Sequence, residues 1–404
     1  MSGGWVENAR QGAVEYGLDD VMNASRSIVM LRSNDVLADS RVQKESKSLA
    51  EHGYRVRVVG WDRAFTHPPQ ERFINATKAK VTLVGIRASY SGGFKRNFLP
   101  LLRFQLAIAN QLVRRRHEYG YIHACDFDTA FIACIVNAFL KKKFVYDIFD
   151  YYIDAFNVPS RIKPLIARLD RWVMKHADSI IVCNEKRREQ ICFSDQRKVF
   201  VIHNSPQSID KSVGQTDGVS LCHNIDIVDI VYVGVFAPGR LIEELLELVE
   251  ERCDVRLHIA GFGALENEVR AAAERCGHVR FYGKLSYEDA LQLESKATIM
   301  IALYDPDCPN HKYAAPNKFY EALMLGKPLI TTKGIGIDEI IESQSFGVAT
   351  HYSKEGLSKG IDAVLEMLRK REVDRSKMKR TFEVEYSWNR MADRLLSIYA
   401  ALES

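Results

Sequence analysis

Residues 316–332 read PNKFYEALMLGKPLITT, which combines a short helix, a stop signal and an apolar strand in that order. Apolar residues in the first half repeat at the helical spacing and predict one buried face. Gly326 and Pro328 then end the helix, because glycine suits the left-handed backbone of a helix end and proline cannot continue a helix. The apolar run 329–332 is typical of a strand in a parallel sheet. A helix that leads directly into such a strand indicates an α/β fold.

The start of this predicted helix carries groups that suit a phosphorylated ligand. Pro316 and Asn317 are helix-entry residues, so the first turn offers free backbone N–H groups and the positive end of the helix dipole. Lys318 adds a positive charge, and Glu321 follows one turn later. N–H groups and a lysine bind phosphate, and a carboxylate accepts hydrogen bonds from sugar hydroxyls. We therefore expect this helix end to bind a nucleotide diphosphate and its ribose.

The rest of the chain repeats the alternation of strand and helix. Residues 27–31 predict a buried strand, a helix runs on to residue 49, and residues 54–59 predict the next strand, which together form a βαβ unit. A second series of this kind opens at residues 227–233. The predicted organisation is a polar lead-in over residues 1–26, a first α/β domain over 27–205, a linker over 206–226, a second α/β domain over 227–384 and a terminal helix over 385–404.

The composition agrees with this domain organisation and indicates which kinds of partner the protein binds. The 404 residues are enough for two or three domains, and 47% of them are hydrophobic. Residues 1–205 carry 32 Lys and Arg against 21 Asp and Glu, whereas residues 206–404 carry 24 against 31. A basic first half predicts contact with an anionic surface or acceptor. No nucleic-acid motif accompanies it, so nucleic acid is not an expected partner.

The sequence also predicts a compartment and the absence of a metal. It shows no secretory signal and no apolar run long enough for a membrane span. The eight cysteines form no CxxC and do not cluster with histidines at metal-ligand spacing. We expect reduced cysteines in a cytoplasmic protein, and no metal site.

Residues 95–116 predict an amphipathic helix with a basic side. Lys95, Arg96, Arg103 and the three arginines 114–116 alternate with apolar residues, and no acidic residue falls among them. Such a helix can lie on an anionic membrane surface. The alternative is a helix that packs against its domain and exposes a solvated basic face.

The segment PNKFYEALMLGKPLI closely resembles the donor-site segment of GT-B glycosyltransferases, specifically the large retaining family 4. Other stretches resemble further elements of that family in the same order, so the resemblance extends from residue 27 to residue 402. These stretches are residues 121–129, 144–150, 177–184, 199–205, 261–266, 279–285 and the YSW at 386–388.

This resemblance implies the GT-B fold, in which two Rossmann-like domains with parallel sheets face each other across a cleft. It implies a retaining, metal-independent glycosyltransferase without a cofactor, which takes a hexosyl or N-acetylhexosaminyl group from a UDP- or GDP-sugar. The acceptor is then a glycan or a lipid-linked glycan in cell-surface polysaccharide synthesis. The expected location is the cytoplasm, peripherally at the inner face of the membrane.

The family pattern also assigns roles to single positions. Those that match its catalytic groups are Arg240, Lys318, His123 and Asp126. Those that match its donor-binding groups are Glu321, Asn317, Gly239, Gly261, Gly263, Lys284, Leu285 and Pro316. Those on the acceptor side are Asn34, Asp35 and Arg41.

One position departs from the family pattern, in which two glutamates are often separated by seven residues. Glu321 matches the second glutamate, and Tyr313 stands in place of the first. This departure keeps open a catalytically silent GT-B partner subunit, and a GT-B sugar-nucleotide epimerase is a further alternative. Two Asp-x-Asp triplets, at 126–128 and 305–307, would instead indicate metal-dependent sugar transfer.

Overall fold

A computed structural model describes residues 24–65, 72–74, 79–89, 93–156, 158–207 and 227–403. The chain divides into two compact units, residues 1–202 with 392–404 and residues 203–391. Most of the predicted lead-in, residues 1–23, and most of the predicted linker, residues 208–226, lie outside the described residues. In the described part of the chain, no helix is long and apolar enough to cross a membrane.

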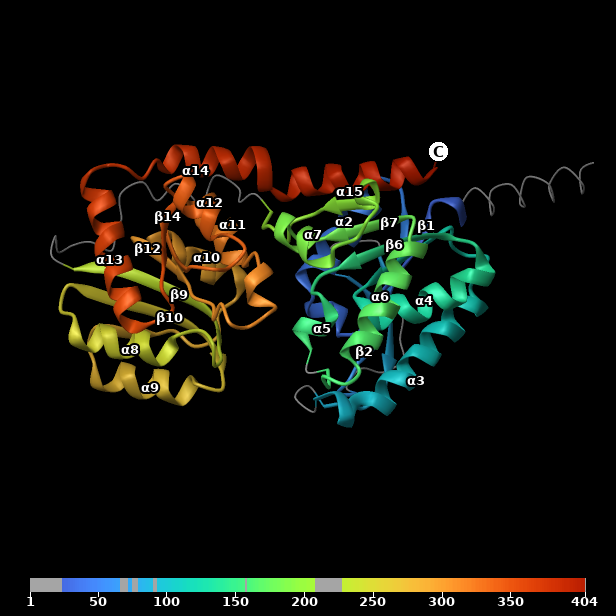
Figure 1. The fold of residues 1–404 in the computed structure, drawn as a ribbon, viewed down its shortest axis with the longest axis horizontal. Coiled ribbons are helices and arrows are strands. Elements are labelled where there is room, and N and C mark those ends of the chain that lie inside the picture. Colours follow the sequence, from blue (N-terminus) through green and yellow to red (C-terminus); the bar gives the residue numbers. More distant parts are fainter. Residues whose placement is uncertain are drawn as a thin grey trace, which may run out of the picture. The chain divides into compact units, whose positions relative to one another are not determined.

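The first unit contains a sheet in the order β3-β4-β2-β1-β5-β6-β7-β8, which is parallel except for the edge strand β3 (Figure 1). Its strands are β1 (Ser27–Leu31), β2 (Arg55–Asp62), β3 (Arg72–Phe73), β4 (Lys80–Gly85), β5 (Tyr121–Cys125), β6 (Lys143–Ile148), β7 (Ser179–Val182) and β8 (Val199–Val201). Its helices are α2 (Ser40–Glu51), α3 (Gly93–Arg114), α4 (Phe127–Leu140), α5 (Tyr152–Ala155), α6 (Lys163–His176) and α7 (Glu185–Ile191), with short 3-10 turns at Val36–Ala38 and Gln196–Lys198.

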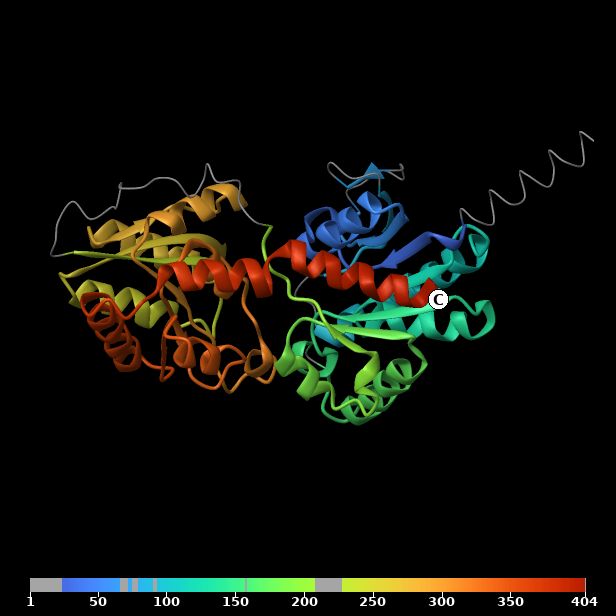
Figure 2. The ribbon, with the colours of Figure 1, turned by 90° about the horizontal axis from the view of Figure 1, so that it is seen from above.

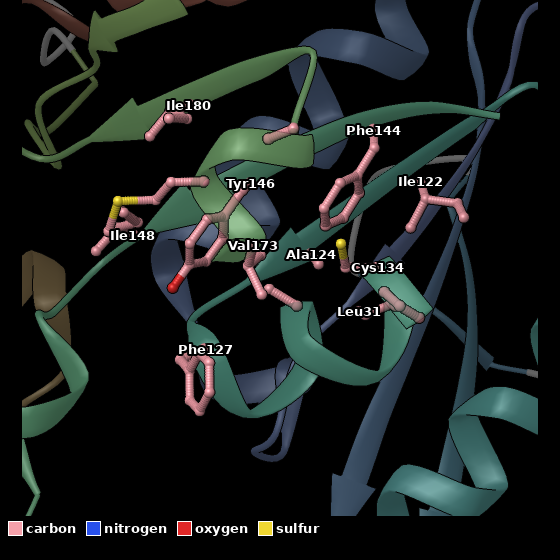
Figure 3. Packing of buried hydrophobic residues seen from close by; sticks show 14 of the residues in the cluster. Leu31, Ile122, Ala124, Phe127, Cys134, Phe144, Tyr146, Ile148, Val173 and Ile180 are labelled. Carbon is pink, nitrogen blue, oxygen red and sulfur yellow. The ribbon is translucent and has the colours of Figure 1, made fainter. Parts of the chain in front are cut away.

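The core of this unit follows from the alternation of side chains along its strands. Ile122 and Ala124 of β5 point toward α4, where they meet Phe144, Tyr146 and other buried side chains (Figure 3). His123 lies between them in sequence and therefore points to the opposite face. That face is covered by α2 and by the part of α15 (Trp388–Glu403) from Ala392 onward, which lies over the strands in Figure 2.

The second unit contains a parallel sheet in the order β11-β10-β9-β12-β13-β14. Helices α8, α9 and α13 cover one face, and α10, α11, α12 and α14 cover the other. The strands are β9 (Val228–Phe236), β10 (Val255–Gly263), β11 (Val279–Phe281), β12 (Ile299–Ala302), β13 (Leu329–Thr332) and β14 (Gly347–Thr350). The helices are α8 (Ile242–Glu251), α9 (Glu266–Arg275), α10 (Tyr287–Lys296), α11 (Asn317–Leu325), α12 (Asp338–Ser343), α13 (Lys354–Arg369) and α14 (Arg375–Thr381), with a 3-10 turn at His311–Tyr313 and a π-turn at Phe382–Tyr386. These two sheets confirm the predicted fold class.

The helix predicted over residues 95–116 is α3. Phe104, Ile108 and Leu112 are buried against the sheet, which explains part of its apolar pattern. A second apolar row on α3 is exposed instead. It consists of Phe98, Leu99, Leu102, Leu106 and Val113.

The glycines 261 and 263, which the family resemblance assigns to donor binding, are part of the last three residues of β10. Gly261 pairs with Gly234 of β9. A Cβ atom at Gly261 would lie 1.8 Å from the Gly234 carbonyl oxygen. The two strands therefore approach too closely for any side chain at this position.

Gly261→Ala is expected to lower the free energy of unfolding by about 3 kcal/mol or more, through this clash and through a φ of +149° that disfavours alanine. Urea unfolding measures the change. Gly277→Ala is the matched control, since a Cβ atom there meets nothing within 4 Å. Equal stability of the two variants would contradict the packing argument.

Candidate active site

Arg240 lies in the turn between β9 and α8, at the carboxyl end of the second sheet. Gly239 precedes it with a φ of +82°, a conformation that favours glycine. The Arg240 guanidinium stacks on the ring of Tyr304, with its Cζ atom 3.7 Å from the ring centroid. Its Nη1 atom is buried and has no hydrogen-bond partner among the described residues. A buried cationic donor of this kind is suited to an anionic ligand.

Helix α11 begins at Asn317, with Pro316 as its N-cap, and ends before Gly326, which has a φ of +65°. The structure thus confirms the helix, its two ends and the strand predicted over residues 316–332. The N-cap residue Pro316 makes no side-chain hydrogen bond to the first turn, so the N–H groups at this helix start are suited to bind an anion. The Asn317 amide oxygen accepts a hydrogen bond from Asn204 at 3.3 Å.

Lys318 lies between two buried carboxylates. Its Nζ atom is 2.6 Å from Glu321 Oε2 and 2.7 Å from Glu294 Oε1. Glu294 comes from the last turn of α10 and is 1% exposed. Sequence reasoning named Lys318 and Glu321 and missed Glu294. The available signal was an acidic residue on the face of α10 that otherwise carries the buried residues Ala290, Leu291 and Leu293.

This arrangement shifts the proton affinities of its members. Burial, together with the charge of Glu321, raises the pKa of Glu294 to about 8, although Lys318 opposes the shift. Burial would lower the pKa of Lys318, but the charges of Glu321 and Glu294 outweigh it and raise that pKa. One ammonium group therefore serves two carboxyl groups, and Glu294 is mostly protonated at neutral pH.

Tyr304 follows β12 and connects these groups. Burial raises the pKa of its hydroxyl, while the nearby charges of Arg240 and Lys318 lower it and that of Glu321 raises it. The charges of all three residues thus act on the Tyr304 hydroxyl, and Arg240 contacts its ring directly. Tyr304 is a second site residue that sequence reasoning missed, because no motif marks it.

The other predicted donor-binding positions lie at the carboxyl ends of β10 and β11. Gly261 and Gly263 end β10, and between them Phe262 exposes about half of its side chain. The Nζ atom of Lys284 lies 5.0 Å from the centre of the Phe262 ring. Leu285 packs against the core of the unit. An exposed aromatic ring beside a lysine suits the stacking of a nucleotide base.

In the first unit, polar residues gather after β1 and β5. Asp126 is buried, forms an ion pair with Arg32, and accepts a hydrogen bond from the Phe149 N–H at 2.9 Å. Asp35 caps the turn after β1 by accepting from the Leu37 N–H, and the Asn34 amide donates to Asp39 at 2.9 Å. Burial raises the pKa of Asp126 to about 7, although Arg32 lowers it.

Two residues predicted to face a ligand are buried inside the first unit. The Arg41 side chain is 3% exposed and donates to Asp147 at 2.9 Å and to the Ile202 carbonyl at 2.7 Å. His123 is fully buried, with Nδ1 2.8 Å from the Tyr399 hydroxyl. Both side chains are thus buried, and the catalytic role of His123 and the acceptor-side role of Arg41 stay predictions. Both hold α2, β5 and β6 together beneath the site.

The described residues include one group with the spacing of metal ligands, formed by His123, Cys125 and Asp147. The Asp147 carboxylate of this group already accepts hydrogen bonds from the Arg41 guanidinium. The positive charge of Arg41 therefore neutralises the carboxylate that a metal cation would need. In the triplet at 305–307, Asp305 Oδ1 accepts from the backbone N–H of Asp307 at 2.9 Å. In the triplet at 126–128, the first carboxylate is paired with Arg32.

The second unit therefore presents three kinds of positive group from two elements: Arg240 from the turn after β9, and Lys318 and the N–H groups of the first turn from α11. Developing negative charge on a phosphate oxygen is stabilised by such positioned donors. Glu321 adds an acceptor for hydroxyl groups beside them. This combination suits a sugar diphosphate or a nucleotide diphosphate.

Comparison with known proteins matches each unit to a glycosyltransferase family model. Residues 38–205 match the family described as "Glycosyl transferase 4-like domain", and residues 228–368 match "Glycosyl transferases group 1". An uncharacterized glycosyltransferase of Methanocaldococcus jannaschii is 22% identical over 301 residues, which cover 70% of this chain and 75% of that protein. Spore coat protein SA of Bacillus subtilis is 27% identical over 185 residues, or 42% of this chain and 48% of that protein.

Solved structures show the same fold. Sucrose-phosphate synthase from Thermosynechococcus elongatus superposes with a TM-score of 0.73 at 15% identity, covering 93% of this chain and 99% of that chain. HepE of Anabaena in complex with UDP superposes with a TM-score of 0.68 at 14% identity, covering 93% of this chain and all of that chain.

Proposed function

The chain belongs to the group 1 glycosyltransferases and has the GT-B fold, and from this premise we propose the reaction that it catalyses. We propose that it moves a hexosyl or N-acetylhexosaminyl group from a UDP- or GDP-sugar to a glycan or lipid-linked acceptor, with retention of configuration and without a metal. The observation that carries the proposal is the buried Arg240 Nη1 atom, which lacks a partner among the described residues.

In this reaction the bond between the anomeric carbon and the diphosphate breaks, and a bond forms between that carbon and an acceptor hydroxyl on the same face. The leaving diphosphate gains negative charge and takes up the hydroxyl proton. Arg240, Lys318 and the N–H groups of α11 stabilise that charge before the proton arrives. Glu321 accepts hydrogen bonds from the donor's ribose, and Lys318 holds this carboxylate in place at 2.6 Å.

UDP is the first nucleotide to test. HepE of Anabaena, which has the same fold, was solved with UDP and with UDP-glucose. In this chain, Phe262 and Lys284 are suited to stack and pair with the base at the ends of β10 and β11. A GDP-sugar is the alternative donor.

The exposed row on α3 supports a membrane-facing role in this proposal. Phe98, Leu99, Leu102 and Leu106 are exposed on a helix that has no acidic residue. Such a face suits insertion beside the headgroups of an anionic leaflet, at the inner face of the membrane, where a lipid-linked acceptor for cell-surface polysaccharide would be reached. Pelleting with vesicles of anionic phospholipid tests it, with Leu99→Glu/Leu106→Glu against Val384→Glu, an exposed residue of the other unit.

A thermal-shift panel of nucleotides and nucleotide sugars, with and without EDTA, tests the donor site. UDP or GDP is expected to raise the unfolding temperature equally with and without EDTA. A ligand at 100 times its dissociation constant stabilises a protein by about 2.7 kcal/mol. Glu321→Ala is expected to weaken this binding at least tenfold, since a lost hydrogen bond to a charged group costs roughly 1.5–3 kcal/mol.

The panel, together with assays of sugar transfer and of sugar-nucleotide interconversion, distinguishes the alternatives. A shift that disappears with EDTA would contradict the metal-independent mechanism. A donor that binds but reacts with no acceptor would favour the silent partner subunit. Interconversion of the free nucleotide sugar without an acceptor would favour the epimerase. No response to any nucleotide would overturn the donor site.

A further inference from the structure

A cavity of about 770 Å³ lies in the first unit, at the amino end of its sheet. Its lining includes the first residues of β1, β2 and β4, which are Ser27, Arg55 and Lys80, and the last turn of α3. The polar residues Asn34 and Asp126 follow the opposite ends of β1 and β5. The five residues of β1 separate the two ends by roughly 16 Å. The cavity is therefore distinct from the sites described above.

The described lining of this cavity is rich in cationic side chains. Arg55, Arg57, Lys80 and Arg115 contribute to it, and Glu118 is the only acidic residue among the described lining residues. Arg115 Nη1 lies 2.9 Å from Glu118 Oε2, and Arg57 Nη2 lies 3.9 Å from the same oxygen. The described part of the lining therefore carries four cationic side chains and one carboxylate.

The inner wall of the cavity is apolar. Ile28, Val56, Val59 and Tyr119 are buried and line it beneath the charged rim. Ligand sites typically enclose about 300–1,000 Å³ and combine apolar walls with a few charged groups. A ligand that satisfies this cavity has an anionic end and an apolar end.

We propose that this cavity binds a phosphate ester that carries an apolar group. Guanidinium groups recognise phosphate oxygens in pairs, and three of the four cations are arginines. The apolar group then lies against the buried wall. The headgroup of an anionic phospholipid and a small soluble organic phosphate share this chemistry. The phospholipid is the favoured source because of where the cavity lies. Gln111 and Arg115 line the cavity, and Val113 of the same turn belongs to the exposed apolar row of α3 that we propose to face the membrane.

Isothermal titration with three probes tests the site and separates the two sources. Dihexanoyl phosphatidylglycerol below its micelle concentration carries the phosphate and acyl chains. Phenyl phosphate carries a phosphate ester without acyl chains. Dihexanoyl phosphatidylcholine carries the same chains with no net charge. We expect saturable binding of the first probe, at least tenfold tighter than binding of the third.

The double variant Arg55→Gln/Arg115→Gln is expected to weaken that binding at least tenfold. Arg161→Gln, another exposed arginine of the first unit outside this lining, is the matched control and keeps the affinity. Thermal unfolding and the response to UDP verify that the double variant is folded and that its donor site is intact. Tight binding of phenyl phosphate that the double variant loses would support a soluble ligand in the same cavity. Binding of neither anionic probe, equal binding of phosphatidylcholine, or full binding by the double variant would each overturn the proposal.

Discussion

Arg240→Ala is expected to lower kcat/KM for sugar transfer about 10- to 150-fold while the unfolding temperature stays close to that of the unchanged protein. The expected loss is that of a hydrogen bond to a charged group, about 1.5–3 kcal/mol, and each 1.4 kcal/mol corresponds to a factor of ten. The guanidinium is held over Tyr304 by stacking, and its buried Nη1 atom has no partner among the described residues. Arg240→Ala therefore removes a positive charge from the ligand-binding site and breaks no ion pair that the structure shows.

Two further variants make this prediction specific. Arg240→Lys keeps the charge but loses the planar pair of donors, so we expect an intermediate kcat/KM. Arg270→Ala removes an exposed arginine of the same unit that pairs with Glu266 at 3.1 Å, and we expect unchanged kinetics. If Arg240→Ala behaved like Arg270→Ala, Arg240 would have no place in the donor site.

The helices and strands could be predicted from the sequence because residue spacing and single residues at helix ends determine them. The helix over residues 317–325 and its end at Gly326 depend on spacing and on one left-handed residue, and the structure reproduces both. The position of Gly261 and Gly263 could not be predicted in the same way. Their requirement for glycine comes from the approach of β9, which is 27 residues earlier in the chain for the pair Gly261 and Gly234.

The residues of the candidate site also differ in whether the sequence could identify them. Arg240, Lys318 and Glu321 carry a family pattern and were named from the sequence. Glu294 has no motif, and its contact with Lys318 depends on how α10 packs beside α11. His123 does match a family segment, but the pattern says nothing of exposure. The alternation along β5 turns this residue toward Tyr399 and the interior.

Lys318→Met is expected to lower the free energy of unfolding by about 3–5 kcal/mol at pH 7.5, in addition to its effect on donor binding. The substitution leaves Glu294 and Glu321 buried side by side without a cation, and removal of one partner of a buried ion pair costs about this much. Lys354→Met is the matched control. The Nζ atom of Lys354 also meets two glutamates, Glu247 and Glu251, but both are exposed, so we expect little change.

The double variant Glu321→Gln/Lys318→Met separates the loss of the cation from other effects of the substitution. Removal of the Glu321 carboxylate, which Lys318→Met leaves without its cation, is expected to recover at least about 1 kcal/mol of the stability lost in Lys318→Met. Equal stability of the double and single variants would exclude Glu321 as the carboxylate that Lys318 neutralises. A loss in Lys318→Met as small as that in Lys354→Met would show that the ion pairs carry no stability.

The dependence on pH gives the same test a second readout. The pKa of Glu294 is about 8 in the folded chain and near 4.5 ordinarily, so its protonated form is favoured by folding. This contribution to stability is fully present below about pH 4.5 and is lost as the pH rises through 8, by about 1.4 kcal/mol per pH unit in between. Glu294→Gln cannot titrate and lacks this slope. The unfolding free energy of Glu294→Gln minus that of the unchanged protein is therefore expected to rise between pH 6 and pH 9, and a constant difference would contradict the buried, proton-sharing arrangement.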